Sequence, residues 1–316
     1  MNHLNLREAD KVEITSLVDN YTDLLLYDNT EVVRRHWTDP KKGVRGVLLA
    51  EHGLSFLVKV YSGTEEHLCL FDAGLTDICL IHNAAILGVD LAKIESAVLS
   101  HGHRDHFYGF RKFFEMSGRR IPLVLHPDAF LERRINIPAE EAPRVLPLLD
   151  ESALIEVGAE LHKIKEPYLL CSELALALGE VQRVTDFEKG FPWAEAKING
   201  VWMVDPFHDD QGLVLKLKGK GLIVIGGCSH AGIINTIKYA QKVTGAEKVY
   251  AVLGGFHLTG ALFEPIIGVT VEEMKKISPD FVVPMHCTGW KAINQFAQEM
   301  PTQFLLNVVG TTYTFQ

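Results

Sequence analysis

Four residues that could bind a metal ion lie within six positions of one another, in a segment that reads Leu-Ser-His-Gly-His-Arg-Asp-His-Phe-Tyr-Gly over residues 99–109. They are His101, His103, Asp105 and His106. If they are buried, three imidazoles and a carboxylate so close together need hydrogen-bond partners, protons or a cation. We therefore predict a metal site. The alternative is a solvated polar loop, which the density of ligand types disfavours.

The spacing of these residues allows one or two ions. If residues 97–100 end a strand, His101 and His103 project to the same side of the next turn and can chelate one ion. Asp105 and His106 then turn toward a second position nearby. Imidazole with carboxylate suits zinc first, then iron, manganese or cobalt. A closed structural zinc site usually includes thiolates, which this segment lacks, so we expect an open catalytic site in which Asp105 orients a metal-activated water.

Three apolar segments later in the chain each lead into a histidine. Because the ends of neighbouring strands converge at one edge of a sheet, we expect these histidines to lie close together. A histidine at a strand end can also be purely structural, and this alternative stays open for the second of the three. They are His230, His257 and His286, after residues 221–226, 248–253 and 281–284.

Three further residues are candidates for supporting roles. Asp72 follows a strand expected over residues 67–71, where a carboxylate often accepts the second ring N–H of a metal-bound histidine. His52, in a turn before the strand expected over residues 54–61, is either a surface residue or part of a pocket lining. Arg183 is a candidate for binding an anionic substrate, with a surface salt bridge as the alternative.

The five cysteines are odd in number and scattered, which fits reduced thiols rather than a disulfide framework. Two of them, Cys228 and Cys287, lie near candidate ligands, so oxidation or softer metal coordination stays open. A buried thiol usually behaves as a small apolar group, and we therefore expect both to have packing roles. The remaining cysteines are Cys69, Cys79 and Cys171.

The 316 residues are 47% hydrophobic and 22% charged, enough for a sizeable core. We expect a single domain over residues 1–316. The net charge of −9 argues against nonspecific nucleic-acid binding, because phosphate contacts need clustered Lys and Arg. The sequence shows no basic segment followed by an apolar one at its start and no apolar run of membrane-spanning length. We expect a cytoplasmic protein with a small-molecule substrate and no nucleic-acid or membrane partner.

The hydrophobic periodicity alternates between strands and helices. A nearly continuous apolar run over residues 221–226 follows a strand over residues 211–218, and together they predict a hairpin. The periodicity weakens over residues 128–205, which we interpret as an insertion that covers the active site. Further strands are expected over residues 11–18, 43–49 and 121–125, and helices over residues 75–87, 107–117, 233–244 and 271–276.

The motif set resembles the metallo-β-lactamase superfamily. The most specific element is His-x-His-x-Asp-His over residues 101–106, with Asp72 before it and His230 and His286 after it. Other motifs resemble the dihydropteroate-synthase-like branch, which is related to an archaeal enzyme that joins a dihydropterin to ribofuranosylaminobenzene phosphate. The resemblance covers about residues 13–289, and these motifs lie at residues 51–55, 179–183, 187–188, 227–230, 254–258 and 286–289.

The resemblance implies an αββα sandwich, in which two mixed sheets lie face to face with helices outside and a metal site at one rim. It also implies which residues hold each ion: His101, His103 and His230 the first, and Asp105, His106 and His286 the second. Many hydrolases of the superfamily have an aspartate that bridges the two metals. The corresponding turn here, residues 254–257, contains no acid, so a second ion is expected to bind weakly or not at all. His257 is expected to face the substrate or to complete the coordination.

These observations together predict a metal-dependent hydrolase that acts on a small, anionic or phosphorylated substrate. The alternative is a pterin-related transferase that forms a carbon–nitrogen bond, with the metal as Lewis acid on the leaving group. A redox role is less expected, because the di-iron relatives carry an added flavin domain, and the intact ligand set disfavours a binding protein with a relic site. The acidic charge disfavours a ribonuclease, and the missing export signal disfavours a β-lactamase.

Overall fold

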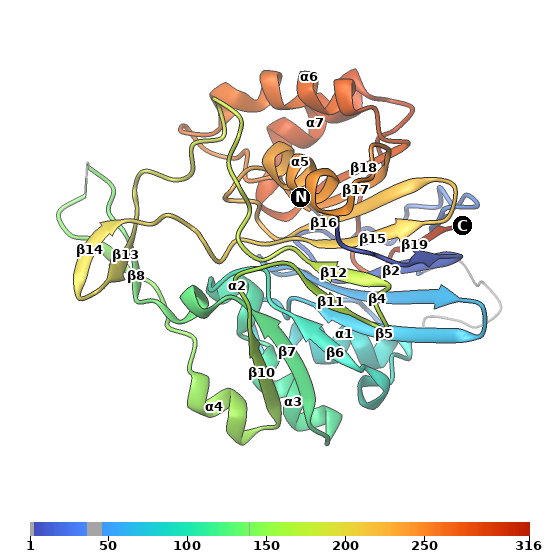
Figure 1. Ribbon diagram of the computed structural model, residues 1–316, viewed down its shortest axis with the longest axis horizontal. Helices are drawn as coiled ribbons and strands as arrows, with labels where there is room; N and C mark the ends of the chain where they lie inside the picture. The colour runs from blue at the N-terminus through green and yellow to red at the C-terminus, as the bar shows by residue number, and fades with distance from the viewer. Residues whose placement is uncertain (1–2, 37–45, 139) are drawn as a thin grey trace.

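The structure is a computed structural model that describes residues 3–36, 46–138 and 140–316. Two mixed β-sheets lie face to face, and helices cover the outer face of each sheet (Figure 1). The expected αββα sandwich is confirmed. A third, smaller sheet, which the sequence did not predict, extends to one side.

The first sheet, here called the N-terminal sheet, is built mostly from residues before 164. Strands β5, β6, β7 and β10 pair in parallel, so their carboxyl ends meet at one edge. In order across the sheet, the strands are β10 (Ala159–Lys163), β7 (Ile121–Leu125), β6 (Ser96–Val98), β5 (Glu65–Phe71), β4 (Ser55–Ser62), β2 (Lys11–Val18), β19 (Thr312–Phe315) and β3 (Val33–Arg34).

The second sheet, here called the C-terminal sheet, confirms the predicted hairpin, because β15 and β16 pair antiparallel with Leu217 opposite Gly221. Strands β16, β17 and β18 pair in parallel and end at the same edge. The strands in order are β11 (Tyr168–Leu170), β12 (Ala175–Ala177), β15 (Leu213–Leu217), β16 (Gly221–Gly226), β17 (Val249–Gly255) and β18 (Phe281–Met285), and β1 (Glu8–Ala9) pairs with β15.

Apolar layers hold the sandwich together. The core between the two sheets contains Phe56 and Phe71 from the N-terminal sheet and Ile225 and Leu253 from the C-terminal sheet. A second core joins the C-terminal sheet to its helices, and a third joins the N-terminal sheet to its own. The helices on the C-terminal sheet are α5 (Ile233–Thr244), α6 (Ile267–Ile277) and α7 (Trp290–Glu299), and those on the N-terminal side are α1 (Cys79–Leu87), α2 (Arg104–Phe107), α3 (Phe110–Ser117) and α4 (Glu151–Glu156).

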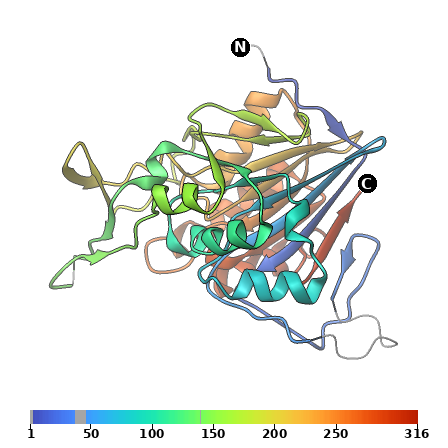
Figure 2. The ribbon, with the colours of Figure 1, turned by 90° about the horizontal axis from the view of Figure 1, so that it is seen from below.

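The segment expected as an insertion, residues 128–205, is only partly separate from the core. Its strands β10, β11 and β12 belong to the two main sheets. These strands have three to five residues each, too short for a clear alternation in the sequence. The rest of the segment forms the small sheet, which projects sideways in both views (Figures 1 and 2): β14 (Val201–Val204), β13 (Ala194–Ile198), β8 (Arg133–Ile135) and β9 (Arg144–Val145).

Two predicted helices differ from the structure at their starts. The helix expected from residue 75 begins at Cys79, because the Glu51 carboxylate accepts the N–H groups of Leu75 and Thr76 and holds them in a loop. The helix expected over residues 107–117 is divided into α2 and α3 at Gly109, where a Cβ would lie 2.1 Å from the Ala73 carbonyl oxygen.

Of the strand expected over residues 43–49, residues 43–45 lie outside the described part of the chain, and residues 46–49 form no strand. Within the described ranges, none of the helices has the length and apolar character needed to cross a membrane.

Candidate metal centre

The histidine-rich motif begins where β6 ends, at the carboxyl edge of the N-terminal sheet. His101 and His103 lie in the turn after the strand, and Asp105 and His106 lie in the short helix α2 that follows. The turn is fixed at Gly102, whose N–H donates to Asp209 Oδ2 at 2.8 Å. Only glycine fits there, because a Cβ would lie 2.2 Å from the Ala129 carbonyl oxygen.

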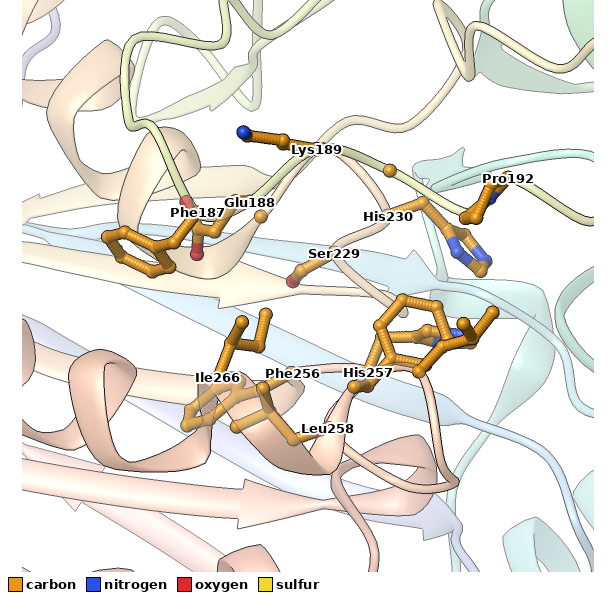
Figure 3. A pocket seen from close by; sticks show the side chains of 14 residues that line it. Phe187, Glu188, Lys189, Pro192, Ser229, His230, Phe256, His257, Leu258 and Ile266 are labelled. Atoms are coloured by element: carbon orange, nitrogen blue, oxygen red, sulfur yellow. The ribbon is translucent and has the colours of Figure 1, made fainter.

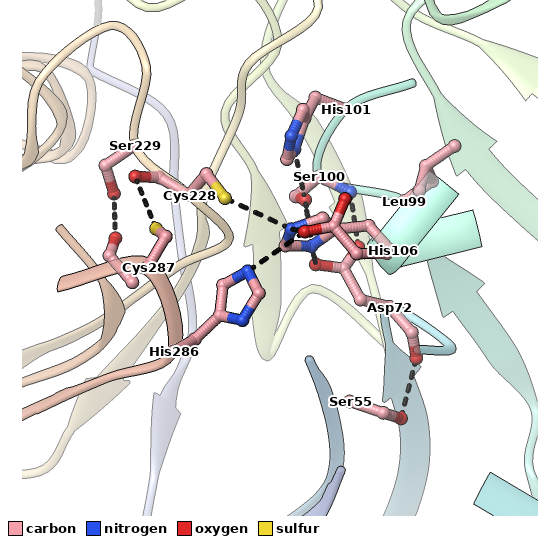
Figure 4. Close-up of polar contacts among 12 residues, drawn as sticks. Ser55, Asp72, Leu99, Ser100, His101, His106, Cys228, Ser229, His286 and Cys287 are labelled. Atoms are coloured by element: carbon pink, nitrogen blue, oxygen red, sulfur yellow. Dashed lines mark hydrogen bonds and ion pairs between the residues drawn. The ribbon is translucent and has the colours of Figure 1, made fainter. Parts of the chain in front are cut away.

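Asp72 follows β5 and orients His106 from beneath the motif. Its backbone has φ +58°, in the left-handed region, and its side chain is fully buried. It accepts hydrogen bonds of 2.7 Å from the Ser100 N–H, the Ser100 hydroxyl and His106 Nδ1 (Figure 4). Burial lowers the pKa of His106, but the carboxylates of Asp72 and Asp105 outweigh it and raise the pKa to about 9, so a cation bound at Nε2 would take the place of a proton there. Asp72 therefore lies where the expected supporting role requires it.

Three turns at the edge of the C-terminal sheet bring their histidines to the same place. His230 follows β16, His257 follows β17 and His286 follows β18. His257 and His286 both have positive φ, at +45° and +52°, a strained conformation that surrounding contacts must hold. For His286 these contacts come from the loop after β2, where Asp19 Oδ1 accepts its N–H and Asn20 donates to its carbonyl oxygen.

Rings from both sheets form a triangle around one point. The ring centroids of His101 and His103 are 4.6 Å apart, and His230 lies 4.8 Å from the first and 4.9 Å from the second. Phe207 stacks on His230 with a centroid distance of 4.3 Å. The three imidazoles that the resemblance assigned to one ion are therefore adjacent and held by packing.

A second group gathers around Asp105. Its Oδ2 lies 3.4 Å from His286 Nε2, 3.7 Å from His106 Nε2 and 3.7 Å from His52 Nε2. Burial raises the pKa of Asp105, but the neighbouring His106 and His286 outweigh this and hold it well below its usual range. The side chain is 17% exposed, so this carboxylate reaches both the buried histidines and solvent.

Several ring nitrogens in the two groups are buried without a hydrogen-bond partner among the described residues. They include Nε2 of His101, His103 and His286 and both ring nitrogens of His230. Burial lowers the pKa of His103 to about 3 and the pKa values of His101 and His230 well below 6.5, so these rings are neutral. Neutral, buried imidazole rings whose lone pairs lack a donor fit bound divalent cations, which would satisfy one nitrogen of each ring.

Cys228 lies between the two groups, which the sequence did not predict. Its Sγ is 3.2 Å from His106 Nε2 (Figure 4). It lies within 4.8 Å of ligand atoms of Asp105, His106 and His286, and equally of His101 and His230. In the sequence, Cys228 comes two residues before His230, and from the sequence alone we expect a packing role for this thiol.

A cavity of about 200 Å³ opens beside His230 and His257 (Figure 3). Its lining is largely apolar and aromatic, and Phe263 meets the His257 ring edge-on with centroids 4.5 Å apart. Lys189 adds a positive charge. The lining comes from three loops: residues 187–192, 229–232 and 256–266.

The two remaining candidates lie at the margin of the site. His52 is exposed, and its ring lies 4.9 Å from that of His286. Arg183 is also exposed and donates to the His230 carbonyl oxygen at 3.4 Å, but it is not among the described residues that line the cavity. The sequence did not predict a buried ion-pair group beside the histidine-rich motif. In this group Arg133 pairs with Asp205 and Asp209, each at 2.7 Å.

No family model matches the chain. A protein of Methanocaldococcus jannaschii, 7,8-dihydropterin-6-methyl-4-(beta-D-ribofuranosyl)-aminobenzene-5'-phosphate synthase, is 29% identical over 304 residues, which cover 95% of this chain and 96% of the synthase. An uncharacterized protein of the same organism is 33% identical over 255 residues, which cover 79% of this chain and 88% of that protein.

Among solved structures, a metal-dependent hydrolase of the beta-lactamase superfamily superposes with a TM-score of 0.73 at 24% identity, over 96% of this chain and 98% of that one. The metallo-beta-lactamase fold protein YhfI from Bacillus subtilis superposes with a TM-score of 0.50 at 10% identity, over 97% of this chain and all of that one. This chain has the metallo-β-lactamase fold. It is similar to the pterin-related synthase along nearly its whole length, in agreement with the resemblance that the motifs indicated.

Proposed function

We propose that this protein, which has the metallo-β-lactamase fold, is a metal-dependent hydrolase that acts on a small anionic or phosphorylated substrate. The observation that carries the proposal is the set of buried imidazole nitrogens without partners in the described part of the chain, which gather near Asp105, while His230 and His257 also line a cavity. Such a set is costly to bury unless a cation binds it. Its open side toward Asp105 is typical of a catalytic rather than a structural site.

In this proposal, His101, His103 and His230 hold one ion, and Asp105, His106 and His286 hold a second. Nitrogen and oxygen ligands favour zinc, with iron or manganese as alternatives. When bound, the metal lowers the pKa of a water molecule and polarises the bond under attack. The residues that hold the site in shape are Asp72, which fixes the His106 ring, and Asp19, which fixes the turn at His286.

The chain's own residues supply the remaining requirements of hydrolysis. The Asp105 carboxylate stays ionised and partly exposed, so it can accept a hydrogen bond from a water molecule and orient it at the boundary between the buried histidines and solvent. His52 faces the same carboxylate and can contact a substrate from the exposed side. Lys189 lines the cavity and offers a positive charge to an anionic group, while the apolar wall excludes water from the rest of the substrate.

A second candidate is a transferase that forms a carbon–nitrogen bond on a pterin. Two observations favour it: the synthase relative aligns with 95% of this chain, and the wall of the cavity is aromatic. Aromatic rings such as Phe263 and His257 can stack on a flat heterocycle. In this reaction the same metal would act on the leaving group of the dihydropterin, and an arylamine would take the place of water.

The test is a comparison of the two reactions on one metal-loaded preparation. Chromogenic phosphomonoesters and phosphodiesters report hydrolysis, and consumption of an arylamine with a dihydropterin activated at its 6-methyl carbon reports transfer. We expect metal-dependent hydrolysis that is lost in Asp105→Asn and in protein treated with a chelator. The matched control is Asp90→Asn, an exposed aspartate that caps a short helical turn outside the site.

Arylamine consumption without hydrolysis would replace the hydrolase by the transferase. Full hydrolytic activity in Asp105→Asn, or after complete removal of metal, would show that this site does not carry the reaction.

A further inference from the structure

The thiol of Cys228 occupies the centre of the candidate metal site. The residue lies in the turn between β16 and α5 and is 3% exposed. Its Sγ lies within reach of both candidate groups, Asp105, His106 and His286 on one side and His101 and His230 on the other. The position that belongs to both groups is therefore filled by sulfur.

The surroundings of Cys228 differ from those of a packing cysteine. Cys69 lies within the apolar core between the sheets, and Cys79 lies within the apolar layer under α1. Cys228 instead faces the His106 ring nitrogen at 3.2 Å. Asp72 accepts the proton on the other nitrogen of that ring, so Nε2 and the sulfur point to the same space.

An independent observation shows that polar atoms without partners face this space. His286 Nε2 and His101 Nε2 are buried and without hydrogen-bond partners in the described part of the chain, and each belongs to a group that includes Cys228 Sγ. Three kinds of lone pair thus meet at one place: imidazole, carboxylate and sulfur. A hydrogen bond from the single thiol proton can satisfy one of them at a time, whereas a divalent cation can bind them together.

We propose that Cys228 is a further ligand of the metal centre and would bind the metal as a thiolate, together with residues of the two groups that its Sγ reaches. As the metal binds, the thiol proton passes to solvent and the sulfur lone pair forms the bond to the ion. A thiolate ligand shifts the preference of the site toward zinc or ferrous iron and away from manganese, which favours oxygen ligands. This inference rests on the proposed metal-dependent function.

The test uses cobalt(II) bound to the metal-free full-length chain, because cobalt reports its ligands by optical absorption. Visible ligand-field bands show that the ion occupies a protein site, and a near-ultraviolet sulfur-to-cobalt charge-transfer band shows a thiolate ligand. We expect both in the wild type and loss of the charge-transfer band alone in Cys228→Ser. In the zinc form, X-ray absorption should show a sulfur shell at about 2.3 Å beside nitrogen at about 2.0–2.1 Å, with sulfur absent from the variant.

Cys287→Ser is the matched comparison, because Cys287 is buried nearby and forms a group of possible ligands with Cys228 and His257, but belongs to neither the group of Asp105 nor the group of His101. We expect this variant to keep the charge-transfer band. Two results would overturn the assignment of Cys228 and leave the metal-dependent function standing. One is ligand-field bands without a charge-transfer band in the wild type. The other is loss of the charge-transfer band in Cys287→Ser rather than in Cys228→Ser. Absence of any cobalt binding would overturn both.

Discussion

The substitution Asp72→Asn isolates the contribution of one buried carboxylate to metal affinity. Asp72 Oδ2 accepts two hydrogen bonds, from Ser100 Oγ and from His106 Nδ1, and Oδ1 accepts a third from the Ser100 N–H. Asparagine keeps the shape but replaces one oxygen by an NH₂ group. In either orientation of the amide, at least one of the present donors then faces another donor.

The expected cost follows from this count. A buried polar group left without a partner costs about 1–3 kcal/mol. Loss of the partner of a metal-binding histidine typically lowers metal affinity about 10–100-fold, which corresponds to about 1.4–2.7 kcal/mol. The two ranges agree, so we expect zinc or cobalt to bind Asp72→Asn about 10–100-fold more weakly than the wild type.

The assay is competition for the metal against a chromogenic chelator at fixed pH, with circular dichroism to show that the variant is folded. Asp90→Asn, which removes an exposed carboxylate far from the site, is the control and should bind metal as the wild type does. Wild-type affinity in a folded Asp72→Asn would refute the reasoning, because His106 would then keep its orientation without the carboxylate.

Two further predictions concern the packing beneath the site. Gly227→Ala places a Cβ 2.1 Å from Ser100 Oγ, so we expect the free energy of unfolding to fall by about 1–3 kcal/mol in chemical denaturation. The control is Gly268→Ala in α6, where an added Cβ makes no close contact and should not destabilise the protein. Equal stability of the two variants would contradict the packing argument. Arg133→Met leaves Asp205 and Asp209 buried without their cation, and we expect the free energy of unfolding to fall by about 3–5 kcal/mol in the same measurement. For Arg134→Met, at the partly exposed pair with Glu195, we expect a loss of at most about 1 kcal/mol. Similar losses in the two variants would show that burial does not set the cost of losing the cation.

The sequence predicted the parts of the fold in which local pattern and tertiary structure agree. The helix expected over residues 233–244 has those bounds in the structure, because its apolar face packs on the C-terminal sheet and Gly245 ends it in the left-handed conformation. The strand over residues 11–18 is likewise as predicted. The small sheet could not be predicted, since its strands are short and their partners lie up to about 60 residues away in the sequence, as for Arg134 opposite Glu195.

Candidate ligands that directly follow an apolar strand could be predicted from the sequence. Residues whose role depends on their neighbours in the buried site were harder to predict. The histidines after β6, β16, β17 and β18 converge because the parallel strands of each sheet end at one edge. Cys228 was assigned to packing, because a thiol in sequence carries no sign of whether its neighbours will be apolar or polar. The support of Gly102 by Asp209 joins residues 107 positions apart, and no local pattern encodes it.

The walls of the cavity and the turns that hold the candidate ligands come from largely separate stretches of chain. Loops at residues 187–192 and 258–266 supply much of the lining, whereas the histidine-rich motif at residues 101–106 supplies none of the lining residues that the structure describes. Mutations in these loops can therefore change which molecule fits while the ligand geometry, fixed at strand ends, is preserved. Related chains with this architecture are expected to diverge first in substrate, and a graft of both loops between relatives should transfer selectivity without loss of bound metal.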